Sequence, residues 1–198
     1  DVVEVDDVDN LTMYPLPPMP LRYHMNAWYW LTRDVSWDPD FPTTAQIAKD
    51  MFWIGQRQEV DGVIALNQWF LQTLVEALEG FHSPDTGELI TAEKFMTFLE
   101  QEKTKAGRAY MDLLVQQAIE ELHNPSSPTV LFNLARGISN ALSQKQLMLY
   151  LNDPILQSQL VDQGWSGTLF SGPGDSILVI DSNIGWSKVD RNIERSLD

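Results

Sequence analysis

The sequence contains no cysteine, few basic residues and no long hydrophobic run. Without cysteine, its 198 residues form no disulfide framework, no thiolate-bound zinc or iron-sulfur site and no cysteine nucleophile. No stretch reaches the roughly 18 apolar residues that indicate a membrane-spanning helix. Composition therefore excludes thiol chemistry, but it does not by itself assign a function.

Basic residues are scarce, because 13 Lys and Arg stand against 28 Asp and Glu, and the formal net charge is -15. Binding to nucleic acid depends on neutralising phosphates, and binding to anionic lipid depends on clustered positive charge. A chain as acidic as this is expected to repel both. We therefore predict that nucleic acid is not a partner.

The hydrophobic pattern predicts a single α/β domain over residues 1–198, since about 150 residues make one domain. Short apolar runs predict strands buried on both faces, and apolar residues at helical spacing predict helices. The expected strands are 60–66 and 176–182, and the expected helices are 43–56, 70–78, 92–122, 128–151 and 154–164. Thr43 or Thr44 is expected to cap the first helix, Gly80 to end the second and Gly107 to interrupt the third. The expected fold class is a mixed sheet covered by helices, with a helix-rich C-terminal half.

The N-terminal part is rich in proline and tryptophan. Residues 1–9 alternate valine with acidic residues, which predicts a short edge strand. Residues 14–20 hold four prolines and are expected to form an extended connector or docking arm. Five of the seven tryptophans lie within the first 69 residues. We favour an aromatic-rich core as the explanation, and a carbohydrate-stacking surface is the alternative.

Carboxylates on a stiff turn mark one candidate ligand site. Asp38 and Asp40 flank a proline just before a predicted helix. They could hold a divalent cation, or they could cap the helix and its turn, which we favour. The three histidines are too far apart in sequence to predict a metal site.

Two further groups of polar residues are candidates. Asp181, Asn183 and Lys188 lie at the C-terminal end of the second predicted strand, where open α/β sheets bind ligands, although a simple turn is the favoured explanation. The scarce arginines, Arg33 and Arg108 among them, would form an anion site if the fold brought several together. Scattered surface ion pairs are the simpler explanation for them.

Blocks of sequence along nearly the whole chain resemble a bacterial domain of unknown function, number 4012 in its series. The blocks are 36–45, 60–66, 89–93, 149–153, 164–167 and 179–188. The resemblance implies an extracytoplasmic, envelope-associated body behind an N-terminal membrane anchor, and membrane association only through that anchor. We therefore expect the given chain to be a piece excised from a longer, membrane-anchored protein. The resemblance implies no established activity, and whether the chain is an enzyme stays open.

Residues 43–120 are also similar, more distantly, to the LytR-CpsA-Psr enzymes, which transfer polyprenyl-pyrophosphate-linked glycopolymers onto the bacterial cell wall. The similar elements are a helix, an Asp-led strand at 60–64 and a helix that bears Arg108. The resemblance implies that Arg108 matches the first arginine of an Arg-x-x-Arg-Gln element that contacts the pyrophosphate. Met111 and Asp112 stand where that element has its second arginine and its glutamine. No cofactor is identified, and Mg2+ is expected only if a phosphotransferase-like activity exists.

These resemblances predict an extracytoplasmic domain that binds or handles a lipid-pyrophosphate-linked glycopolymer or another cell-wall component. Arg33 belongs to the expected site because Arg33 and Asp34 resemble the end of a Pro-Arg-Asp motif in the same enzymes, with Thr32 in place of the proline. The alternative is a non-catalytic surface module that makes a protein or carbohydrate contact. The residues expected to bind the ligand are Arg33, Asp40, Arg108, Asp181, Asn183 and Lys188.

Overall fold

The structure is a computed structural model that describes residues 13–83, 86–101, 105–170, 174 and 177–180; for 98–101 and 105–109 it describes the backbone alone. The described residues fall into two compact units. Unit 1 comprises Gly62–Gly167, and unit 2 combines the described residues up to Asp61 with those from Thr168 onward. Whether the two units together make the single domain expected from the sequence stays a prediction.

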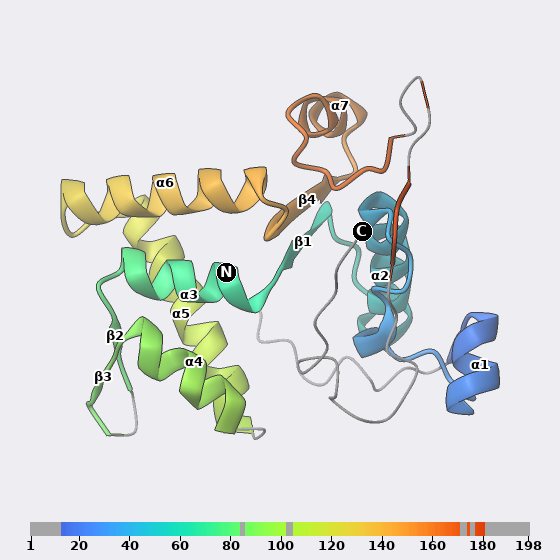
Figure 1. Ribbon diagram of the computed structural model, residues 1–198, viewed down its shortest axis with the longest axis horizontal. Coiled ribbons are helices and arrows are strands. Elements are labelled where there is room, and N and C mark those ends of the chain that lie inside the picture. The colour runs from blue at the N-terminus through green and yellow to red at the C-terminus, as the bar shows by residue number, and fades with distance from the viewer. Residues whose placement is uncertain (1–12, 84–85, 102–104, 171–173, 175–176, 181–198) are drawn as a thin grey trace. The chain divides into compact units, whose positions relative to one another are not determined.

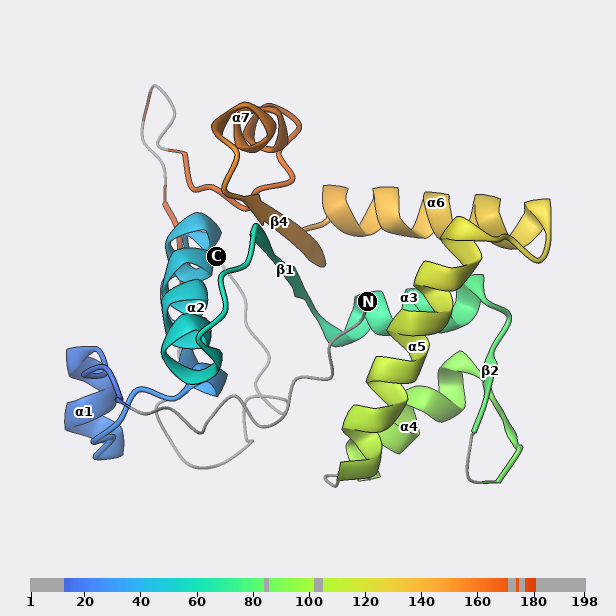
Figure 2. The ribbon, with the colours of Figure 1, turned by 180° about the vertical axis from the view of Figure 1, so that it is seen from behind.

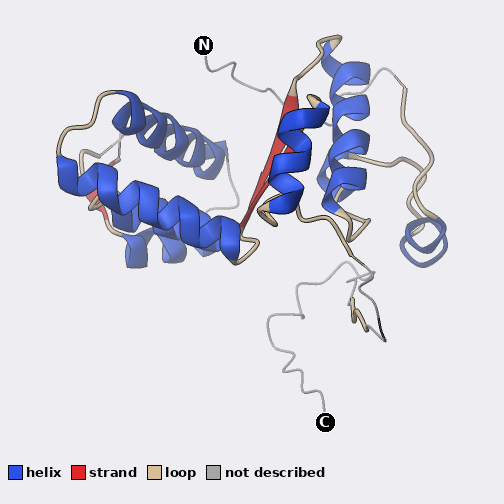
Figure 3. Ribbon diagram, turned by 90° about the horizontal axis from the view of Figure 1, so that it is seen from above, coloured by secondary structure: helices blue, strands red, loops and turns tan. Residues whose placement is uncertain are grey.

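Helices make up most of the regular structure in each unit (Figure 3). Unit 2 contains α1 (Met19–Met25), the short 3-10 helix η1 (Thr32–Asp34) and α2 (Phe41–Gln56). Unit 1 contains, in chain order, β1 (Gly62–Leu66), α3 (Gln68–Ala77), β2 (Phe81–His82), β3 (Leu89–Ile90), α4 (Ala92–Gln101), α5 (Lys105–His123), α6 (Pro128–Ser143), β4 (Leu147–Leu151) and α7 (Pro154–Asp162) (Figure 1). The expected helix-rich α/β fold is confirmed, and the described strands pair antiparallel in two small sheets.

The first expected helix is confirmed as α2, but its cap is Asp40 and not Thr43 or Thr44. The Asp40 carboxylate accepts hydrogen bonds from the Thr43 N–H at 3.1 Å and from the Thr43 hydroxyl at 2.8 Å. It thereby satisfies a first-turn N–H that no helical carbonyl can reach. Thr44 is buried, and its hydroxyl donates to the Asp38 carbonyl at 2.9 Å.

Residues 60–66 contain the strand β1, but the prediction that both of its faces are buried is wrong. β1 pairs antiparallel with β4, from Gly62 opposite Leu151 to Leu66 opposite Leu147. Ile64 is 66% exposed. A Cβ at Gly62 would collide with the Tyr150 carbonyl oxygen, so this position needs glycine. A short apolar run does not by itself distinguish a central strand from a strand of a two-stranded sheet.

The expected helix over 128–151 is too long, because a turn and a strand replace its last eight residues. α6 ends at Ser143, and Lys145 adopts a left-handed conformation with φ 58°. The chain then reverses into β4, whose apolar residues continue the pattern that predicted a helix. The expected helix over 154–164 is confirmed as α7, and the Asp153 carboxylate caps it by accepting from the N–H groups of Ile155 and Leu156.

The core of unit 1 forms where α3 packs against α4, α5 and α6 (Figures 1 and 2). Phe81 lies edge-on to Phe95 with ring centroids 5.9 Å apart, and Tyr110 lies 6.2 Å from Phe81. Gly80 lies in the turn that ends α3, where its N–H donates to the Val75 carbonyl and its φ of 99° favours glycine, but Glu79 before it is already left-handed with φ 59°. The expected core positions of this helix are buried, namely Phe70, Leu71, Leu74, Val75 and Leu78.

Other expectations fail or lie outside the described residues. Residues 177–180 of the second predicted strand are not a strand, and Ile177 is 88% exposed, so that prediction is wrong over the described part. The predicted helix over 92–122 is interrupted, as expected, and forms α4 and α5. The interruption lies before Gly107, because α5 begins at Lys105. The predicted edge strand at 1–9 lies outside the described residues. None of the described helices is long and apolar enough to cross a membrane.

Candidate functional site

A groove follows the exposed face of α3 in unit 1. Trp69, Gln72, Thr73 and Glu76 recur at spacings of three and four residues, so they lie on one face of the helix. Trp69 is 54% exposed, whereas the positions on the other face are buried in the core. The helix begins at Asn67, whose side-chain oxygen accepts from the Phe70 N–H at 3.1 Å. This cap, together with the buried face, fixes which side chains line the groove.

The first part of this groove is a hollow of about 530 Å³ that is lined by side chains of α3 and α6. Asn133, Arg136 and Asn140 of α6 and its C-cap residue Gln144 line this hollow, and they again recur at three or four residues. Gln146, just after α6, adds another amide. Five of the lining residues of this hollow carry side-chain amides, namely Gln72, Asn133, Asn140, Gln144 and Gln146.

α4 lines a second hollow of about 820 Å³ on the same exposed face of α3. Thr91, Glu93, Met96 and Thr97 are among its lining residues. Trp69, Gln72 and Glu76 line both hollows. We call the two hollows together the α3 groove, because the exposed face of α3 is common to both.

Hydrogen bonds between neighbours orient the polar side chains of the α3 groove. The Gln72 amide donates to the Glu76 carboxylate at 3.0 Å, and the Gln146 amide donates to the Gln144 amide oxygen at 2.9 Å. Arg136 lies over the Phe132 ring, 5.7 Å from its centroid. An amide offers two N–H donors and a carbonyl with two acceptor sites, so these bonds use only part of the capacity of each group.

Gly137 marks a close approach of α6 to α3 beside the groove. A Cβ at this position would lie 2.7 Å from the Cγ2 methyl of Thr73. Thr73 is held in place, because its hydroxyl donates to the Trp69 carbonyl at 3.0 Å. Replacing the glycine would therefore force the two walls apart or displace the Thr73 side chain.

Three charged side chains line the α3 groove, and their formal charges sum to -1. Glu76 and Glu93 carry negative charge and Arg136 carries positive charge. No group of three or more side chains that could hold a metal ion occurs among the described residues. The lining is therefore dominated by neutral amides and hydroxyls around one exposed indole.

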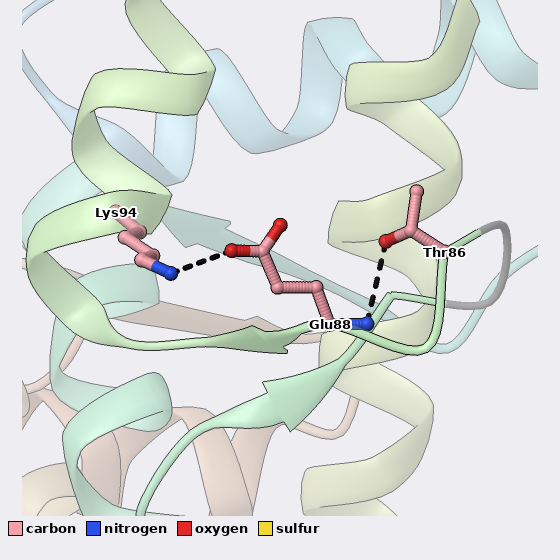
Figure 4. A network of polar contacts seen from close by, with 3 residues as sticks. All are labelled: Thr86, Glu88 and Lys94. Atoms are coloured by element: carbon pink, nitrogen blue, oxygen red, sulfur yellow. Dashed lines mark hydrogen bonds and ion pairs between the residues drawn. The ribbon is translucent and has the colours of Figure 1, made fainter.

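An ion pair secures the start of α4, which lines the groove. The Lys94 ammonium donates to the Glu88 carboxylate at 2.6 Å, and the Glu88 N–H donates to the Thr86 hydroxyl at 3.3 Å (Figure 4). The hydrogen bond from Lys94, together with its positive charge, lowers the pKa of Glu88 below the ordinary value of 4.5. The pair connects the residue before β3 to the first turn of α4 across an exposed surface.

Asp40, one of the predicted ligand residues, makes cap and turn contacts in unit 2. Besides Thr43, its carboxylate accepts a hydrogen bond from the Leu169 N–H at 3.0 Å. Partial burial works to raise the pKa of Asp40, but the hydrogen bonds from Leu169 and Thr43 outweigh it, and the pKa lies below 3.8. These contacts agree with the cap that we favoured from the sequence, and a ligand at Asp40 stays a prediction.

The described structure does not test whether the remaining predicted ligand residues meet. Arg33 lies in η1 of unit 2, with its guanidinium 4.0 Å from the Asp34 carboxylate. Arg108 lies in α5 of unit 1, where the structure describes only the backbone. Asp181, Asn183 and Lys188 lie outside the described residues. An anion site that combines these residues therefore stays a prediction.

The residues of the α3 groove were not among the predicted ligand residues. Two signals in the sequence point to them. Trp69 interrupts the polar face of a helix whose other face is apolar, and the polar face of 133–144 is rich in amides and carries little charge. The pairing of these two faces depends on packing between helices, which the sequence does not specify.

The fold and the groove define a helix-rich α/β protein with a polar, aromatic-edged groove. Comparison with family profiles matches residues 3–103 to the family described as proteins of unknown function (DUF4012). The match covers just over half of the 198 residues, so the chain belongs to this family. Neither the comparison with curated proteins nor the comparison with solved structures found a match.

Proposed function

We propose that the chain is the glycan-binding part of an extracytoplasmic envelope protein, and that the α3 groove is its binding site. The observation that carries this proposal is the composition of the groove, in which exposed Trp69 stands beside five side-chain amides. The envelope location rests on the sequence resemblance described above.

The groove suits a ligand with many hydroxyl groups. Sites for drug-like molecules are mostly apolar with a few polar groups, whereas the side chains along α3 and α6 here are mostly polar. Each amide donates and accepts, and a sugar hydroxyl does both as well. An indole supplies a rigid flat surface against which the C–H face of a sugar ring packs, at low cost in conformational entropy.

The charges of the groove favour a neutral glycan over an anionic one. Glu76 lines both hollows and Glu93 lines one, while Arg136 is the one basic residue that lines them in the described part of the chain. A phosphate or carboxylate placed there would meet more negative charge than positive. We therefore propose that the α3 groove binds the saccharide portion of an envelope glycopolymer. A separate prediction is an anion and metal site for a lipid pyrophosphate, lined by Arg33, Asp40 and Arg108.

Isothermal titration of the whole chain with neutral and charged oligosaccharides tests the proposal. Chitooligosaccharides and maltooligosaccharides serve as neutral probes, and oligogalacturonate serves as the anionic probe. We expect at least one neutral probe to bind, and Trp69→Ala to weaken that binding by about tenfold or more, as for an anchor residue at the centre of an interface.

Trp53→Ala is the matched control, because Trp53 is 47% exposed and lies in unit 2, with Arg57 stacked 4.7 Å from its ring centroid. It should leave the affinity unchanged. Binding of no neutral probe would contradict the proposal. Preferential, salt-sensitive binding of oligogalacturonate would contradict the assignment of a neutral ligand.

A further inference from the structure

Acidic residues are absent from the segment 13–33 of this otherwise acidic chain. Between Met13 and Arg33 there is no Asp or Glu, and the first acidic side chain that follows is Asp34. The segment carries Arg22, Arg33 and a histidine. In a chain of net charge -15, this is a local reversal of charge.

The same segment exposes large apolar and aromatic side chains. Tyr23 is 79% exposed and Trp28 is 81% exposed. Leu16, Met19 and Tyr29 are each more than half exposed as well. We call Leu16, Met19, Arg22, Tyr23, Trp28 and Tyr29 the aromatic surface. Five of them, all except Tyr29, line a small hollow of about 240 Å³ together with Asn26 and Ala27.

The aromatic surface is held by local contacts. Asn26 ends α1 in a left-handed conformation with φ 49°, and the Ala27 N–H donates back to the Leu21 carbonyl. The rings of Tyr14 and Tyr29 lie 4.9 Å apart. The Trp30 N–H donates to the Pro15 carbonyl at 3.1 Å. The turn after α1 is therefore tied to the proline-rich segment before it, and Trp28 is presented on an ordered turn.

We propose that the aromatic surface docks on the headgroup region of an anionic lipid bilayer. Tyrosine and tryptophan combine an apolar ring with a polar group, and they concentrate at membrane interfaces for that reason. Arg22 lies among these rings, and an arginine can keep its stem in an apolar layer while its guanidinium reaches phosphate.

The net charge of the chain does not oppose this docking strongly. The screening length at physiological salt is about 8 Å, so charges more distant than this are largely screened from the bilayer. The charges that matter are the local ones. Within 13–33 these are Arg22 and Arg33; Asp34 offsets Arg33 at 4.0 Å, so Arg22 is the charge that the aromatic surface itself presents. The expectation that the chain repels anionic lipid rests on its average charge and does not apply to this segment. The inference is independent of the glycan site, which lies in unit 1.

Vesicle flotation tests the proposal with the whole chain. The probes are vesicles of phosphatidylcholine alone and vesicles of phosphatidylcholine and phosphatidylglycerol in equal parts. We expect binding to the anionic vesicles, weaker binding to the neutral ones, and a decrease with added salt. The double variant Tyr23→Ser with Trp28→Ser should lower the partition coefficient by about tenfold, and Arg22→Gln should lower it only on anionic vesicles.

The matched control is Phe132→Ser with Ile155→Ser, which removes two side chains that are 64% and 70% exposed in unit 1. It should leave vesicle binding unchanged, and circular dichroism should confirm that all variants fold. The proposal would be overturned if the chain did not bind anionic vesicles. It would also be overturned if the control variant lost as much vesicle binding as the Tyr23 and Trp28 variant. A dimer that the Tyr23 and Trp28 variant dissociates, without vesicle binding, would instead assign this surface to contact between two copies of the chain.

Discussion

Replacing Gly137 with alanine tests whether α3 and α6 approach as closely as the structure has them. The new Cβ would lie 2.7 Å from the Thr73 methyl, about 0.7 Å inside the 3.4 Å at which ordinary contacts begin. Overpacking of this kind costs about 1–3 kcal/mol. Alanine in place of glycine within a helix returns about 1 kcal/mol. The Gly137→Ala variant should therefore lose up to about 2 kcal/mol of unfolding free energy.

The effect of Gly137→Ala on the unfolding free energy should change sign once the Thr73 methyl is removed. Thr73→Ser keeps the hydroxyl that donates to Trp69 but lacks the Cγ2 atom that the new Cβ would meet. In that background, Gly137→Ala should stabilise by up to about 1 kcal/mol, because only the helix propensity term is left. The double-mutant cycle should give a coupling energy of about 1–3 kcal/mol.

Urea unfolding followed by far-UV circular dichroism measures all four corners of this cycle. Ser139→Ala is the control, because Ser139 is exposed on the same helix and alanine there should only raise helix propensity, by about 0.5 kcal/mol. If Gly137→Ala stabilises by about 1 kcal/mol in both backgrounds, the close approach of the two helices is wrong.

The remaining predictions concern the stability of each unit and the pKa of Glu88. Leu134→Ala should cost about 2–5 kcal/mol in urea unfolding, because Leu134 is fully buried where α6 meets the core. Asp40→Ala should cost about 1 kcal/mol as a lost cap. Because the pKa of Asp40 is lower in the folded state, its contribution is present above pH 3.8 and lost as the pH falls through the folded value, so the cost should shrink there. Glu88 should titrate below 4.5 by NMR, and Lys94→Met should bring its pKa back toward 4.5; an unchanged pKa would rule out the ion pair.

Local patterns in the sequence predicted most of the helices. α2, α3 and α7 lie where apolar spacing and end signals placed them, because those signals act within a few residues. β4 was missed since an apolar run that follows a helix without glycine or proline reads as more helix. The turn at Lys145 depends on a left-handed conformation that lysine seldom adopts, so the residue type does not signal it.

The α3 groove could be predicted only in part. The polar face of α3 and the amide-rich face of 133–144 are each visible in the sequence as helical periodicity. Their juxtaposition is a matter of long-range packing, which depends on the small size of Gly137 and on the core beneath the two helices. Trp69 was attributed to the core along with the other tryptophans, because composition does not distinguish a buried indole from an exposed one.

The most direct test of the α3 groove follows the indole N–H resonance of Trp69 while a neutral oligosaccharide is titrated into the whole chain. The resonance is assigned by its loss in Trp69→Phe. We expect it to shift in a saturable way together with side-chain amide resonances of Gln72 and Asn140, and the Trp53 indole to stay unchanged. Shifts of other resonances with Trp69, Gln72 and Asn140 unaffected would contradict a glycan site in this groove.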